Sequence, residues 1–119
     1  GCNKEILPET FTIGLEQEYQ INKDYLSDDN ELRFEISVIS DSRCPADVVC
    51  VWQGEAVVEI EVKSPQKGEI ELSTFDNLTD TVGSYSFTLI DVSPYPVSTE
   101  IIDPKDYNVK LKVEKLALY

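Results

Sequence analysis

The sequence predicts an all-β domain in which two antiparallel sheets pack face to face. Apolar and polar residues alternate with a period of two in one segment after another, which is typical of strands with one buried face. Gly, Pro, Asn and Asp cluster between these segments, and helical periodicity of useful length is absent from the sequence. We therefore expect an antiparallel β-sandwich of roughly six to eight strands, immunoglobulin-like in type, with a small β-barrel as the alternative.

Three segments in the first half of the chain alternate most clearly. They run from Thr10 to Ile21, from Glu31 to Ile39 and from Ala56 to Lys63. In each segment the apolar side chains fall on one face and the polar side chains on the other, which predicts three half-buried strands. The expected inward residues are Phe11, Ile13, Leu15, Tyr19, Ile21, Leu32, Phe34, Ile36, Val38, Ala56, Val58, Ile60 and Val62.

The second half of the chain has three further candidate strands, at Glu69 to Phe75, Ser84 to Val92 and Val109 to Leu118. The alternation changes phase after Leu89 and again after Val113. One extra residue reverses the face that an alternating pattern presents, so we expect a β-bulge at each change.

Turn-forming residues separate the predicted strands. The expected connections cover residues 24–30, 65–68, 76–83 and 93–106. The last connection is long and contains three prolines. Within it, we expect Asp103 to cap a single helical turn that starts at Pro104.

The three cysteines divide into two groups. Five residues separate Cys44 from Cys50, a spacing that a turn closes into a ring, and we expect a disulfide that stabilises the fold by about 2.4 kcal/mol. Two thiolates without histidine are too few for a structural zinc site, and a pair of free buried thiols is the remaining alternative. A disulfide is typical of proteins outside the reducing cytoplasm.

Cys2 has a different setting. The opening Gly1-Cys2-Asn3-Lys4-Glu5 resembles a bacterial lipoprotein after cleavage of its signal peptide, which implies acylation of Cys2. On this interpretation residues 1–9 are a polar tether, residues 10–119 are a single β-sandwich domain, and the lipid holds the protein in the bacterial outer membrane, on its periplasmic or its surface face. The alternative is an incidental free cysteine on a frayed terminus.

Composition excludes several classes of function. The net charge of −13 disfavours nucleic acids and anionic lipids as partners, and it favours a monomer. The chain has no histidine, which excludes Ser-His-Asp and Cys-His catalysis and imidazole-bound metal. Its five glycines lie far apart, so a phosphate-binding loop is not indicated. We expect a protein that is not an enzyme and holds neither a cofactor nor a metal.

A few residues between the strands are candidates for special roles. We expect Asp41 and Arg43 to form a charge-assisted pair that fixes a loop. Trp52 follows Cys50 by two residues, so we expect its indole to pack in the core against the disulfide; an exposed binding aromatic is the alternative. Tyr95 lies between two prolines, where it either contacts a partner or folds over one end of the sandwich.

The acidic segment from Asp24 to Glu31 offers oxygen ligands of the kind that Ca²⁺ prefers, but it lacks the spacing and the glycine of an EF-hand loop. We therefore expect a solvated hairpin tip. A pair of carboxylates for glycoside hydrolysis is a further hypothesis, and the pattern does not select any pair among the 23 acidic residues.

The stretch Asp41-Ser42-Arg43-Cys44-Pro45, followed by Cys50, Trp52 and Gly54, resembles a motif of small secreted or lipid-anchored bacterial proteins, many from Bacteroidetes. The resemblance implies a compact β domain at the cell envelope and carries no catalytic residues. We therefore expect a non-enzymatic envelope lipoprotein that acts as an interaction or accessory module for a protein or glycan. The alternative is an extracellular protease inhibitor or glycan-binding protein.

Overall fold

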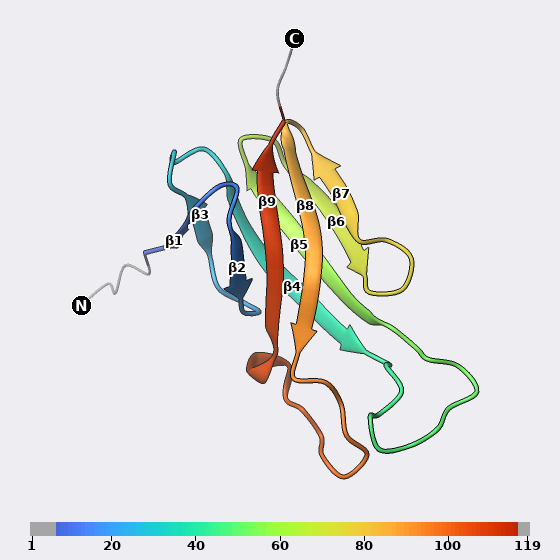
Figure 1. The fold of residues 1–119 in the computed structure, drawn as a ribbon. Helices are drawn as coiled ribbons and strands as arrows, with labels where there is room; N and C mark the ends of the chain where they lie inside the picture. Colours follow the sequence, from blue (N-terminus) through green and yellow to red (C-terminus); the bar gives the residue numbers. More distant parts are fainter. Residues whose placement is uncertain (1–6, 117–119) are drawn as a thin grey trace, which may run out of the picture.

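The computed structural model describes residues 7–116, which form nine strands and one turn of 3₁₀ helix (Figure 1). The strands are β1 (Glu9–Phe11), β2 (Glu16–Tyr19), β3 (Tyr25–Ser27), β4 (Arg33–Asp41), β5 (Ala56–Ser64), β6 (Gly68–Ser73), β7 (Thr79–Val82), β8 (Tyr85–Ser93) and β9 (Asn108–Lys115). Among these residues no helix has the length and apolar character needed to cross a membrane. Cys2, the expected lipid attachment point, lies outside the described residues.

The strands form two sheets, ordered β1-β3-β4-β5-β6 and β2-β9-β8-β7. All pairings are antiparallel except that of β1 with β3. Both sheets are open, so the predicted antiparallel β-sandwich is confirmed. The alternative, a small β-barrel, would need a closed sheet and is wrong. The likeness to immunoglobulin domains lies in the two packed sheets, because the strand order differs: β3 to β6 are consecutive neighbours in one sheet and β7 to β9 in the other.

The core lies between the two sheets and follows the predicted alternation in β4, β5, β6, β8 and β9. Phe34 is at its centre, with its ring 5.2 Å from that of Phe11 and 5.3 Å from those of Tyr19 and Phe87. Edge-to-face contacts of this kind add to the free energy gained by burying the rings. The other fully buried large side chains are Tyr85, Leu32, Ile36, Ile60, Leu72, Leu111, Val58, Val62 and Val92.

The single strand predicted from Thr10 to Ile21 is wrong, because the chain there changes sheet. β1 belongs to the five-stranded sheet and β2 to the four-stranded sheet. Gly14, at φ +89°, makes the turn between them, and its N–H donates to the carbonyl of Val113 at 2.7 Å. Leu15 is consequently exposed rather than buried. Alternation continues across the turn because both short strands face the same core.

One of the two expected bulges is present. The register between β8 and β9 shifts between Leu89 and Asp91, as the change of phase predicts. The second expected bulge is wrong, since β9 ends at Lys115 and Leu116 is exposed. An unpredicted irregularity in β4 between Ile36 and Val38 turns Val38 outward, which corrects its expected inward position.

Two predicted connections contain short strands. β3 lies within residues 24–30 and pairs with both β1 and β4, while β7 lies within residues 76–83 and pairs with β8. These segments become strands because neighbouring strands supply hydrogen-bond partners, which local turn propensity does not reveal. The helical turn is confirmed as Pro104–Asp106, where the Asp103 side chain accepts a hydrogen bond from the Lys105 N–H at 3.1 Å.

Candidate functional site

Two long connections lie side by side at one end of the sandwich, the lower end in Figure 1. They are residues 42–55, between β4 and β5, and residues 94–107, between β8 and β9. The Ala46 N–H donates to the Pro96 carbonyl at 3.0 Å, and Asp47 accepts hydrogen bonds from the N–H and hydroxyl of Ser98. We call these two connections, with residues 74–78 of the β6–β7 connection, the loop end.

Arg43 joins the two connections from inside. Its Nε and Nη2 donate to the carboxylate of Asp41 at 2.8 and 2.9 Å, so the predicted charge pair is confirmed. The same guanidinium donates to the carbonyls of Val92 at 2.7 Å and Pro94 at 3.1 Å. Arg43 is only 8% exposed, and a buried charge is tolerated when its donors are matched in this way. The pair therefore fixes the start of one connection against the start of the other.

Asp41 also accepts a hydrogen bond from the hydroxyl of Tyr107 at 2.8 Å. Burial alone would raise the pKa of Asp41, but the hydrogen bonds from Arg43 and Tyr107 outweigh it and hold that pKa below its usual range. Burial and the hydrogen bond to Asp41 raise the pKa of Tyr107 to about 12. At neutral pH the site therefore contains an ionised Asp41 between a cation and a neutral phenol.

The predicted disulfide between Cys44 and Cys50 is confirmed, with the two Cα atoms 5.9 Å apart. Two backbone hydrogen bonds connect the two arms of this loop next to the disulfide. The Ser42 N–H donates to the Glu55 carbonyl at 2.8 Å, and the Cys44 N–H donates to the Gln53 carbonyl at 2.7 Å. Gly54 allows this close approach, because it has φ +69° and a Cβ there would overlap the Ser42 carbonyl. The motif residues thus form one rigid support.

The expected core position of Trp52 is wrong. Trp52 is 56% exposed, and its ring packs edge-on against Phe75 with the centroids 4.9 Å apart. The chain around Trp52 is not a strand, so the two-residue spacing from Cys50 does not place both side chains on one inward face. The ring occupies the outer surface of the loop end, as the alternative interpretation requires.

Tyr95 folds over one end of the sandwich, as one of its two expected roles requires, and its contact with a partner stays a prediction. Its ring lies over Arg43, with the guanidinium carbon 4.8 Å from the ring centroid, which is the geometry of a cation–π contact. The residue is nevertheless 53% exposed. One face of the ring therefore covers the Arg43–Asp41 pair, and the other face is available to a partner.

Exposed apolar side chains gather at the loop end. Val49 and Val51, on either side of Cys50, are 102% and 110% exposed, which is complete exposure. The exposed apolar residues of the loop end and its border on β8 are Val48, Val49, Val51, Trp52, Phe75, Leu78, Ile90, Tyr95 and Ile101. We call this set the apolar patch. The alternation pattern did not reveal it, although the consecutive apolar residues from Val48 to Trp52 in a loop were a usable signal.

Two hollows border the apolar patch. One, of about 560 Å³, is lined by Arg43, Gln53, Gly54, Thr74, Phe75, Leu78, Ile90, Asp91 and Tyr95. The other, of about 360 Å³, lies on the disulfide ring and shares Gln53 and Tyr95 with the first. The two hollows are therefore adjacent, with the Tyr95 ring between them.

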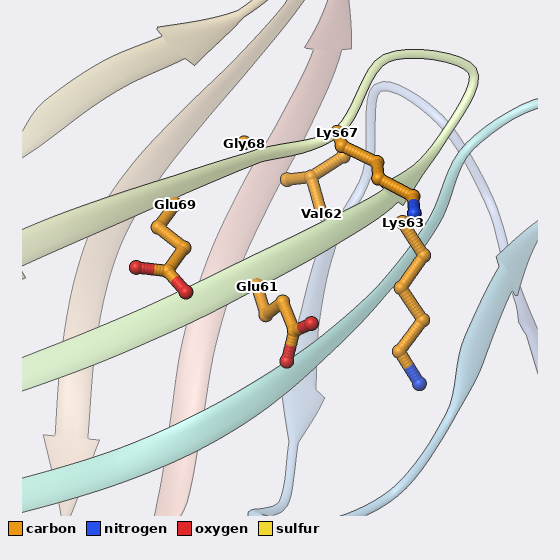
Figure 2. A pocket seen from close by; sticks show the side chains of 6 residues that line it. All are labelled: Glu61, Val62, Lys63, Lys67, Gly68 and Glu69. Atoms are coloured by element: carbon orange, nitrogen blue, oxygen red, sulfur yellow. The ribbon is translucent and has the colours of Figure 1, made fainter.

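A different kind of hollow, of about 340 Å³, lies on the β5–β6 hairpin (Figure 2). Figure 2 shows Glu61 and Glu69 on neighbouring strands, with Lys63 and Lys67 toward the hairpin turn. Glu61 and Glu69 are direct cross-strand partners, and such like-charged pairs are destabilising. This hollow is open to solvent, and four of its six lining residues are charged.

The acidic segment from Asp24 to Glu31 uses its carboxylates within the protein. Asp24 pairs with Arg33, and Asp29 accepts from the Ser27 hydroxyl and the Glu31 N–H. Glu31 accepts from Tyr85 at 2.7 Å and from Lys115 at 2.9 Å. Across residues 7–116, no group of three or more Cys, Asp or Glu side chains is placed to hold a metal ion.

Comparisons with protein-family models, with characterised proteins and with solved structures found no match to this chain. Three properties of the loop end bear on function: a buried ionic support, a short disulfide ring and a set of exposed apolar side chains.

Proposed function

We propose that this protein is a non-enzymatic module of the bacterial cell envelope, anchored through Cys2, whose apolar patch binds another protein. The observation that carries the proposal is the apolar patch itself. Exposed apolar groups of this kind mark interaction sites on soluble proteins, and Trp and Tyr are the residues most enriched among binding hot spots. The disulfide supports a location outside the cytoplasm.

The rigidity of the loop end supports the same function. A loop that is already ordered loses less conformational entropy on binding than a flexible one. Here the disulfide, the Arg43–Asp41 pair and Gly54 order the connection that displays Val49, Val51 and Trp52. Binding of a partner would cover the fully exposed Val49 and Val51 that this ordered connection presents to water.

The proposal is tested by photo-crosslinking from the cell envelope. A photoreactive amino acid replaces Val49, and crosslinked proteins are identified by mass spectrometry, with and without the additional substitution Trp52→Ser. We expect a defined crosslinked protein that Trp52→Ser reduces at least tenfold. The control is Val38→Ser, which alters an exposed valine on β4 outside the apolar patch. Equal crosslinking in all three proteins would contradict the proposal.

The lipid anchor is tested separately. Mass spectrometry of the protein isolated from its native membrane should find acyl chains on Cys2, and Cys2→Ser should release the protein into the soluble fraction. An unmodified Cys2 in the native protein would remove the anchor from the proposal and leave the apolar patch unaffected.

A second candidate is binding of a glycan, supported by the aromatic pair Trp52–Phe75 and the half-exposed ring of Tyr95. Flat aromatic faces suit sugar rings, whereas protruding valines suit the side chains of a protein. Replacing Val49 and Val51 by Ser should therefore abolish binding of a protein and spare binding of a glycan on an array. Inhibition of extracellular proteases, the other alternative, is measured with a panel of proteases and the same double variant.

A further inference from the structure

The irregularity in β8 changes what this strand shows to the surface. The register shift between Leu89 and Asp91 turns Ile90 and Asp91 outward together, whereas Leu89 and Val92 on either side are buried. β-Bulges often re-aim side chains beside functional sites. An apolar side chain and a carboxylate are thereby adjacent on the outer surface, at the border of the loop end.

Both side chains line the hollow of about 560 Å³. Phe75 and Leu78 from the β6–β7 connection contribute further apolar lining beside Ile90. Gly54 contributes only backbone atoms to the lining. The hollow therefore combines an apolar wall with one acidic side chain, Asp91.

Asp91 forms no direct ion pair within the described part of the chain. Asp91 lies opposite Lys110 in the β8–β9 register, but the ion pairs formed by residues 7–116 do not include it. Among the described residues, Arg43 is the only cation that lines the hollow, and its guanidinium is directed to Asp41, Val92 and Pro94, with which it forms four hydrogen bonds. Asp91 is thus free to pair with a cation from outside.

We infer that this hollow receives an extended segment of the partner protein in which an apolar side chain neighbours a Lys or Arg. The apolar side chain lies against Phe75, Leu78 and Ile90, and the cation pairs with Asp91. The inference rests on the proposed function, because it names the chemistry of the partner that the apolar patch binds. Complementary charge at such a rim mainly raises the association rate and selects among partners.

Charge also argues against other occupants. A second copy of this chain would bring its own net charge of −13 and a second Asp91 to the same surface. An anionic lipid surface would be repelled for the same reason. A basic segment of a partner protein is attracted by the whole molecule and by Asp91 in particular.

The test is a selection of random twelve-residue peptides, displayed on phage, against the immobilised full-length protein. We expect enriched peptides to contain an apolar residue next to Lys or Arg. A synthetic copy of the leading peptide should bind Asp91→Lys at least tenfold more weakly than wild type, as measured by isothermal titration calorimetry. Changing the basic residue of that peptide to Glu should restore part of the binding to Asp91→Lys.

The matched control is Glu69→Lys, which makes the same change of charge on the β5–β6 hairpin (Figure 2). It should leave binding of the peptide within about twofold of wild type. Urea unfolding of both variants checks that neither has lost its fold.

The remaining outcomes separate the two proposals. Peptides whose binding needs Trp52 but which lack a basic residue would overturn the inference and leave the proposed function standing. Equal losses in Asp91→Lys and Glu69→Lys would also overturn the inference, since binding would then depend on net charge alone. If none of the selected peptides depends on any loop-end residue, both proposals fall.

Discussion

Two groups of aromatic residues, one buried near the beginning of β4 and β8 and one exposed at the loop end, differ in what holds them in place. Near the beginning of β4 and β8, Phe34 packs against the rings of Phe11, Tyr19, Tyr25 and Phe87, and all five are buried. At the loop end, where these strands finish, Trp52, Phe75 and Tyr95 are all more than half exposed. The first group stabilises the sandwich. The second is held in place by polar and covalent contacts around it, which leaves its ring surfaces available for binding.

The exposed aromatic residues of the loop end are ordered with little burial of their own rings. The order of the loop end comes from the Arg43–Asp41 pair, the disulfide and the backbone bonds between its connections. Stability and binding should therefore respond to different substitutions. Four predictions test this separation, in order of decreasing effect on stability.

Phe34→Ala removes the central ring of the buried group. We expect the free energy of unfolding to fall by about 4 kcal/mol, because the ring is completely buried and its cavity is surrounded by aromatic side chains that cannot collapse. Urea unfolding followed by circular dichroism measures the loss. A loss below about 1 kcal/mol would mean that the buried aromatic group contributes little to the stability of the sandwich.

Asp41→Asn leaves Arg43 buried without its counter-charge, and we expect a loss of about 3 kcal/mol at neutral pH. Because the pKa of Asp41 is lowered in the folded protein, its stabilisation is fully present above the unfolded pKa of about 4 and is lost as the pH falls through the folded pKa. The difference between wild type and variant should therefore shrink below about pH 4. Unfolding at pH 7, 5 and 3 tests this, and a constant difference would contradict it.

Replacing Cys44 and Cys50 together by Ser opens the disulfide ring. We expect a loss of about 2.4 kcal/mol from the greater conformational entropy of the unfolded chain. Binding to the partner should weaken as well, because the connection that displays Val49 and Val51 is less ordered before binding. Calorimetry of unfolding and of peptide binding measures the two effects. A lower free energy of unfolding with unchanged affinity for the peptide would show that the disulfide is not needed for binding.

Trp52→Ser should change the free energy of unfolding by less than about 0.5 kcal/mol, since the side chain is largely exposed and contacts mainly Phe75. Binding through the apolar patch should nevertheless be lost. Thermal unfolding and the photo-crosslinking experiment provide the two measurements. A large loss of stability would place Trp52 with the buried group and remove the contrast between the two regions.

The interpretation from sequence succeeded where local pattern sets the structure. In β5, residues facing the core alternate without interruption, so their burial follows directly from the pleat of a strand. The Cys44–Cys50 spacing and the Asp41–Arg43 pair are likewise local, and both have the expected partners. The bulge in β8 was also visible as a change of phase.

The errors arise where the alternation of apolar and polar residues does not show which segment a residue pairs with or packs against. Gly14 divides a continuous alternating segment because its two halves join different sheets. β3 and β7 become strands because β4 and β8 pass beside them.

The sequence by itself therefore determined the long strands, the disulfide and the ion pair, since these depend on residues close together in the chain. Only the tertiary structure decided that Trp52 faces solvent, because the surroundings of a loop side chain depend on which distant segments cover it. The same packing brings Phe75 from the β6–β7 connection together with Ile90 and Asp91 from β8 around one hollow. The candidate site is thus formed by tertiary packing. The local sequence pattern predicted only the disulfide and the Asp41–Arg43 pair that hold it in place.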